Sequence, residues 1–63
     1  MSLKEFYKTI KRMGCAAKYV EFNGIFPIIR QAVYVWGNAA PAIALAHENG
    51  FIVDTEGKRF IVY

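Results

Sequence analysis

Two polar side chains near the middle of the chain, Arg30 and Gln31, are the residues best suited to recognition chemistry. A guanidinium can make two parallel hydrogen bonds to guanine, and a side-chain amide can make two to adenine. Val33 and Trp36 follow three residues apart, a spacing that places both on one side of a helix. If these two anchor a helix to a core, then Arg30, Gln31 and Tyr34 point outward. We expect those three side chains to contact bases.

The other residue types give little indication of a catalytic or metal-binding site. Cys15 is the only cysteine and His47 the only histidine, which excludes an internal disulfide, a multi-cysteine zinc site and a histidine pair. The five carboxylates have no recognisable acid–base spacing, and the five glycines form no phosphate-binding loop. We therefore expect a binding protein rather than an enzyme, with no cofactor, no metal ion and no small-molecule ligand.

The chain carries a formal charge of +3 at pH 7, from eight basic and five acidic residues. A basic surface favours a polyanionic partner, although charge alone is equally compatible with an ordinary solvated surface. The cationic side chains occur on several predicted elements, so they can converge on one phosphate backbone. The phosphate contacts expected are Lys11, Lys18, Lys58 and Arg59.

Four short helices are predicted to position these side chains. The first begins at a capping box formed by Ser2 and Glu5, after which apolar residues recur at helical spacing. Proline suits the first turn of a helix, and Pro27 accordingly opens the third one. The first three predicted helices cover residues 3–14, 15 to about 21, and 27–36. Asn38 is predicted to cap a fourth helix, which ends at residues 47–50.

Residues 51–63 predict a C-terminal β-hairpin. Two runs rich in β-branched and aromatic residues flank a turn at Asp54–Gly57. Alternation along both strands puts large apolar side chains on two faces, and a chain of 63 residues can cover only one of them. The uncovered face, or the unpaired edge of the last strand, is predicted to form a dimer contact. The residues expected there are Ile52, Phe60, Ile61 and Tyr63.

The stretch Gln31-Ala32-Val33 with Trp36, followed by Gly37-Asn38-Ala39-Ala40-Pro41, resembles the helix-turn-helix of small phage Cro-type regulators and their YdaS-like relatives. In those proteins the recognition helix often reads Gln-Ala-Val-x-x-Trp, and some Cro proteins pair through a terminal β-hairpin. Similar features run through most of the chain, with 22–27 as an enlarged turn. The resemblance implies one Cro-like α+β domain over 1–63, with four short helices that contain a helix-turn-helix and a hairpin at 51–63.

This resemblance also implies a function, that of a sequence-specific, double-stranded DNA-binding transcriptional regulator of the phage repressor type. Helix 27–36 is expected to read the major groove of an operator, and a homodimer places one such helix in each half-site. A protein of this kind acts in the cytoplasm of a bacterial host cell. The chain has no apolar run near the roughly 20 residues of a membrane span, so no membrane partner is expected.

Two other functions remain open from the sequence. A small protein-binding module, such as a phage-encoded inhibitor of a host factor, would use the apolar third helix or the hairpin. It predicts no saturable DNA binding, and a loss of affinity when Tyr34 or Trp36 is changed to alanine. RNA binding ranks below both because the sequence lacks an RNA-binding signature. It would use Tyr7, Tyr19, Tyr34 and the strand Lys58-Arg59-Phe60.

Overall fold

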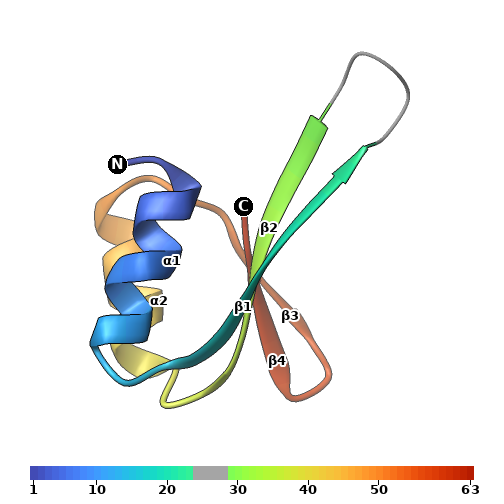
Figure 1. Cartoon of the computed structure of the whole chain (residues 1–63). Coiled ribbons are helices and arrows are strands. Elements are labelled where there is room, and N and C mark those ends of the chain that lie inside the picture. Colours follow the sequence, from blue (N-terminus) through green and yellow to red (C-terminus); the bar gives the residue numbers. More distant parts are fainter. Residues whose placement is uncertain (24–28) are drawn as a thin grey trace.

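A four-stranded antiparallel sheet with two helices on one of its faces forms the protein in a computed structural model, which describes residues 1–23 and 29–63 (Figure 1). The strand order is β1-β2-β4-β3. Strands β2 and β3 run parallel, joined by helix α2, and leave room for β4 between them, which makes a split β-α-β unit. The elements are α1 Leu3–Arg12, β1 Ala16–Asn23, β2 Ile29–Gly37, α2 Ala40–Glu48, β3 Val53–Glu56 and β4 Arg59–Val62.

Helix α1 confirms the predicted first helix and its capping box. The Glu5 amide donates to the Ser2 hydroxyl and the Ser2 amide donates to the Glu5 carboxylate, both at 3.1 Å. These bonds satisfy amides that the first turn leaves without a partner. The apolar stripe then buries Leu3, Phe6 and Ile10 against the sheet.

The capping box makes the stability of α1 depend on pH. The hydrogen bonds from Ser2 lower the pKa of Glu5 below its ordinary value of 4.5. Because the folded pKa is depressed, the stabilisation is complete above pH 4.5 and is lost as the pH falls through the folded pKa. We expect Glu5→Gln, which keeps an acceptor but cannot titrate, to unfold with a weaker dependence on pH below 4.5. Thermal denaturation of both proteins across acidic pH measures this, and parallel curves would contradict it.

The predicted second helix, from Cys15 to about Glu21, is wrong, because this segment is strand β1. Its aromatic and β-branched residues, among them Tyr19, Val20 and Phe22, pack well on a pleated surface. Gly14, at φ +87°, ends α1 and turns the chain into the strand. Successive side chains of β1 then point to opposite sides of the sheet instead of following a helical stripe.

The predicted third helix, 27–36, is also wrong, because β2 covers Ile29–Gly37 and pairs with β1 over its length. The run Val33-Tyr34-Val35-Trp36 is rich in residues that favour strands, and neighbours on both sides satisfy its backbone. The helix-turn-helix arrangement, and with it the Cro-like fold of four helices and a hairpin, is therefore not the fold of this chain. The enlarged turn predicted at 22–27 starts within β1, and its residues 24–27, with Pro27, lie outside the described residues.

The fourth predicted helix is present as α2, but Asn38 does not cap it. Asn38 lies two residues before the helix at φ +53°, and Ala39 occupies the N-cap position without a side-chain hydrogen bond. The Asn38 carbonyl instead accepts a hydrogen bond from the thiol of Cys15, at 3.3 Å. This contact ties the connection before α2 to the start of β1.

The predicted hairpin is present as β3 and β4, but its turn is the two-residue loop Gly57-Lys58 and not Asp54–Gly57, because Asp54–Glu56 belong to β3 and pair with β4. Gly57 has φ +62°, and glycine suits the first central position of a type II′ turn. The hairpin is not a separate unit, however, because β4 also pairs with β2. The last strand therefore has no unpaired edge, which corrects the predicted edge-to-edge dimer contact.

The hydrophobic core lies between the two helices and one face of the sheet. Its largest fully buried side chains are Phe6 and Ile10 from α1, Val33 and Val35 from β2, and Val62 from β4. The ring of Phe6 also lies 5.3 Å from that of Phe51, which follows α2. The fully buried residues of α2, Ala42 and Ala46, are small, so α2 can approach its neighbours closely on this side.

Candidate nucleic-acid interface

The face of the sheet turned away from the helices has no layer over it among the described residues. Strand pairing places Lys18 opposite Tyr34, Val20 opposite Ala32, and Phe22 opposite Arg30. Ile61 pairs with Tyr34 on the other side, and Ile52 and Tyr63 exchange backbone hydrogen bonds of 2.9 and 3.0 Å. We call this surface the open face. Its side chains include Lys18, Val20, Phe22, Arg30, Ala32, Tyr34, Trp36, Ile52, Arg59, Ile61 and Tyr63.

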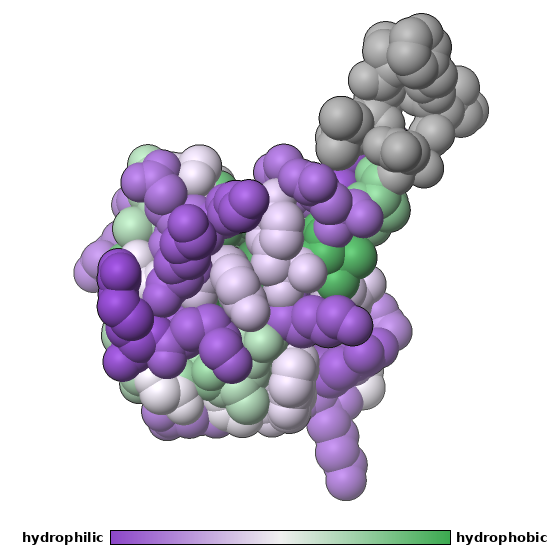
Figure 2. Space-filling view, viewed as in Figure 1, coloured by the Kyte–Doolittle hydropathy of each residue, from purple (hydrophilic) through white to green (hydrophobic). Residues whose placement is uncertain are grey.

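Large aromatic side chains stand exposed on the open face. Trp36 has 52% of its surface exposed, Tyr63 49% and Phe22 45%. An apolar patch is visible where the β1–β2 hairpin leaves the body of the molecule (Figure 2). Aromatic groups this exposed on one surface are typical of a binding site rather than of a solvated face.

Cationic side chains lie next to these aromatic rings. The Arg59 guanidinium carbon is 4.9 Å from the centre of the Tyr34 ring, a cation–π contact, and Lys18 is the strand partner of Tyr34 on the opposite side. Arg30 is likewise the strand partner of Phe22. In each pair, a positive charge lies beside an aromatic ring on the adjacent strand.

The negative charges of the open face are confined to its β3 edge. Asp54 is the strand partner of Ile61, and Glu56 is the strand partner of Arg59. The Glu56 carboxylate and the Arg59 guanidinium also form an ion pair of 2.9 Å. The β1–β2 half carries Lys18 and Arg30, whose side chains have no ion pair among the described residues. Positive charges without an ion pair therefore lie on the β1–β2 half of the open face, beside the rings of Phe22 and Tyr34.

Comparison with known proteins assigns no family to this chain. No family model, no curated protein and no solved structure matches it. Within residues 1–23 and 29–63, no helix is long and apolar enough to cross a membrane, and no three His, Cys, Asp or Glu side chains gather where they could hold a metal ion.

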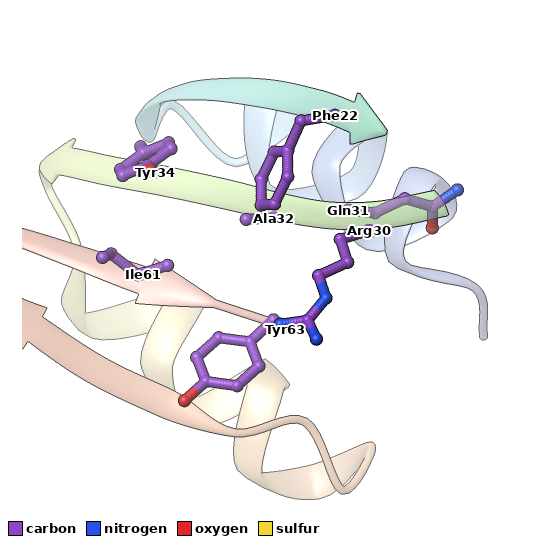
Figure 3. A pocket seen from close by; sticks show the side chains of 7 residues that line it. All are labelled: Phe22, Arg30, Gln31, Ala32, Tyr34, Ile61 and Tyr63. Carbon is purple, nitrogen blue, oxygen red and sulfur yellow. The ribbon is translucent and has the colours of Figure 1, made fainter. Parts of the chain in front are cut away.

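Two of the three predicted base-contacting residues, Arg30 and Tyr34, lie together on the open face, and Gln31 does not. Gln31 follows Arg30 in a strand, so its side chain lies on the other side of the sheet, where its amide donates to Glu21 at 3.3 Å. Its amide points away from the neighbouring cavity (Figure 3). The same carboxylate accepts from the Tyr19 hydroxyl at 3.0 Å, and desolvation together with this bond raises the pKa of Tyr19.

The predicted phosphate-contacting residues are divided between two surfaces. Lys18 and Arg59 belong to the open face, and Lys58 lies in the loop beside it. Lys11 is on the exposed side of α1, in the other layer of the molecule, where hydrophilic side chains cover the helix (Figure 2). Lys11 and Lys18 therefore lie on different surfaces of the protein.

The predicted dimer residues are divided in a similar way. Ile52, Ile61 and Tyr63 are on the open face, whereas Phe60 packs against the core below α1 and α2. Phe22 and Trp36 also belong to the open face. Phe22 was not predicted to belong to a site, and Trp36 was predicted as a core anchor or, for a protein partner, as a contact residue. The sequence shows no clean apolar–polar alternation along 30–36 or 18–22 that would indicate them. They can be assigned to this face only once both segments are known to be strands, in which every second residue shares a face.

Proposed function

We propose that this protein binds single-stranded nucleic acid on the open face, with bases stacked on its aromatic rings. The observation that carries the proposal is the placement of cations beside rings: Lys18 opposite Tyr34, Arg30 opposite Phe22 and Arg59 over Tyr34. Proteins that bind single strands combine a positive surface that follows the phosphates with aromatic side chains that stack the bases. A net charge of +3 supports the same class of partner.

The width of the sheet favours a single strand over duplex DNA. The major groove is about 12 Å wide and admits a helix or a two-stranded ribbon. Where β4 pairs with β2, at Val33–Val35, four strands spaced by about 4.8 Å span more than 14 Å before side chains are added, so the part of the sheet that carries Tyr34 does not fit the groove. An unpaired strand, by contrast, can lay its exposed bases across a flat surface. Operator binding by a dimer stays a prediction, but helix 27–36, which was expected to read the groove, is absent from the fold.

Titration of the wild-type protein with oligothymidine of roughly 12 nucleotides tests the proposal. Trp36 is the only tryptophan and lies on the open face, so stacking on it should quench its fluorescence. We expect saturable binding that weakens as salt rises from about 50 to 200 mM. The matching duplex is expected to bind more weakly than the single strand. Preference for the duplex, or no saturable binding to either probe, would contradict the proposal.

The charge contribution can be isolated with a matched pair of variants. Lys18→Ala should weaken binding of every sequence and flatten the plot of log affinity against log salt by about 0.7 for the lost phosphate contact. Lys8→Ala removes the same charge from the exposed side of α1, in the other layer, and should leave the slope nearly unchanged. If the slope changes equally in both variants, the position of the lysine does not matter, and the open face is not the binding surface.

A protein partner is the second candidate, and the exposed apolar side chains Trp36, Ile52 and Tyr63 are the observation that favours it. Such a surface can be covered by another protein as well as by bases. The two candidates differ in their salt dependence, because contacts between apolar surfaces release few counterions. Binding of oligothymidine that is weak and insensitive to salt would favour the protein partner.

A further inference from the structure

A cavity of about 450 Å³ opens at the end of the face where β1 and β2 leave the body of the sheet. Ala32 forms its floor, and the ring of Phe22 lies beside it (Figure 3). Ala32 is buried, with 4% of its surface exposed, and does not belong to the core cluster. A volume in this range suits a small ring system. The lining residues are Phe22, Arg30, Gln31, Ala32, Tyr34, Ile61 and Tyr63.

Arg30 is the one charged side chain among these lining residues. No hydrogen bond or ion pair to another described residue engages its guanidinium, and the Gln31 amide is bonded to Glu21 outside the cavity. A guanidinium presents only donors, in a planar fork. A ring that enters the cavity is therefore favoured if its edge carries two adjacent acceptors.

We propose that the cavity holds one guanine base of the bound strand, with Arg30 donating to its O6 and N7. This inference rests on the proposed binding of single-stranded nucleic acid. Guanine presents two acceptors side by side on that edge, whereas adenine presents N7 beside an amino donor. Adenine therefore places one donor against another at Arg30. The aromatic and aliphatic walls accept either ring, so the guanidinium makes the distinction.

Oligothymidines that carry a single dG or a single dA at their centre test the inference. Wild-type protein should bind the dG probe at least about fivefold more tightly, as expected for a bidentate arginine–guanine pair. Arg30→Lys keeps the charge but loses the fork, so most of the preference for dG over dA should disappear, whatever the change in affinity for plain oligothymidine measured beside it. Arg59→Lys makes the same chemical change elsewhere on the open face and should keep the preference.

A second variant tests the cavity without changing any charge. Ala32→Val raises the floor with a residue that favours strands, so we expect it to fold and to lose the preference for dG. Circular dichroism and thermal unfolding check its fold. Retention of the full preference in folded Ala32→Val would place guanine recognition elsewhere and overturn the inference.

The possible results separate the inference from the function on which it rests. Equal affinity for the dG and dA probes, or a preference that survives in Arg30→Lys, overturns the guanine assignment and leaves single-strand binding intact. Failure of every oligonucleotide to bind removes both. Free guanosine monophosphate should displace the dG probe only at much higher concentrations, because it keeps the cavity contacts alone. Displacement at equal concentration would make the cavity a mononucleotide site and overturn the inference.

Discussion

Replacement of both Tyr34 and Trp36 by alanine is expected to reduce affinity for single-stranded nucleic acid by at least about 25-fold, with the fold unchanged. Each stacked base contributes about 1 to 3 kcal/mol when its aromatic partner is removed, and 1.4 kcal/mol corresponds to a factor of ten. Trp36 lies half exposed on the open face, outside the core, so its removal leaves the packing of the domain intact. Fluorescence anisotropy of a labelled oligothymidine measures the change, since the variant lacks the tryptophan reporter.

Met13→Ala provides the control for this pair. Met13 is 43% exposed at the end of α1, so the change removes a large apolar side chain at a comparable exposure but away from the open face. Binding by Met13→Ala should equal that of the wild type. If the double variant also binds normally, bases do not stack on Tyr34 or Trp36, and the proposed function loses its basis.

Aspartate at position 33 is expected to unfold the protein, whereas aspartate at position 36 is expected to be tolerated. Val33 is fully buried in the core, and an unpaired carboxylate there costs several kcal/mol. A domain of 63 residues has a total stability of roughly 3 to 9 kcal/mol. Trp36 faces solvent on the open face, so Trp36→Asp keeps its charge hydrated. Far-ultraviolet circular dichroism and urea denaturation distinguish the two results.

The contrast between these positions separates a strand from a helix without a further structure. In a helix, residues 33 and 36 share a face and both substitutions would be equally damaging. In a strand they lie on opposite faces and only one is damaging. Val33→Thr, a smaller change at the buried position, should be folded and less stable than the wild type. Equal loss of structure in Val33→Asp and Trp36→Asp would contradict the sheet described for β2.

Elements with strong local signals were predictable from the sequence. Ser2 and Glu5 have capping-box spacing, and both hydrogen bonds form in α1. The β-rich runs around Gly57 form β3 and β4, with glycine at the position of positive φ. These features depend on residues close together in the sequence, which is why propensity and turn chemistry suffice for them.

The middle of the chain was not predictable by the same means. Val33 and Trp36 are spaced as in a helix, and Pro27 and Asn38 each suit a helix start, so a helix fitted the local pattern. The strand forms because β1 and β4 flank β2 on its two sides, and those pairings join residues distant in sequence. Such partners decide the structure of a segment whose own pattern is ambiguous.

Two of the predicted site residues share a face even though the secondary structure predicted for them was wrong, and the reason is geometric. Arg30 and Tyr34 are four residues apart, a spacing that shares a face in a helix and also in a strand. Gln31 is one residue from Arg30, so it stays beside Arg30 on a helix surface but moves to the opposite face of a sheet. Trp36 was expected to anchor a helix to the core, and it lies instead on the open face.

The contact between Cys15 and Asn38 has a practical consequence for following the motions of this domain. The thiol is 3% exposed and donates to the Asn38 carbonyl, so a reagent can reach it only when α1 and the connection before α2 separate from β1. As the chain has no other cysteine, the rate of alkylation by a neutral reagent times that opening directly. Fast alkylation in a thermally stable sample would reveal local opening. Slow alkylation, at the rate of global unfolding, would mean that the two layers separate only when the whole domain unfolds.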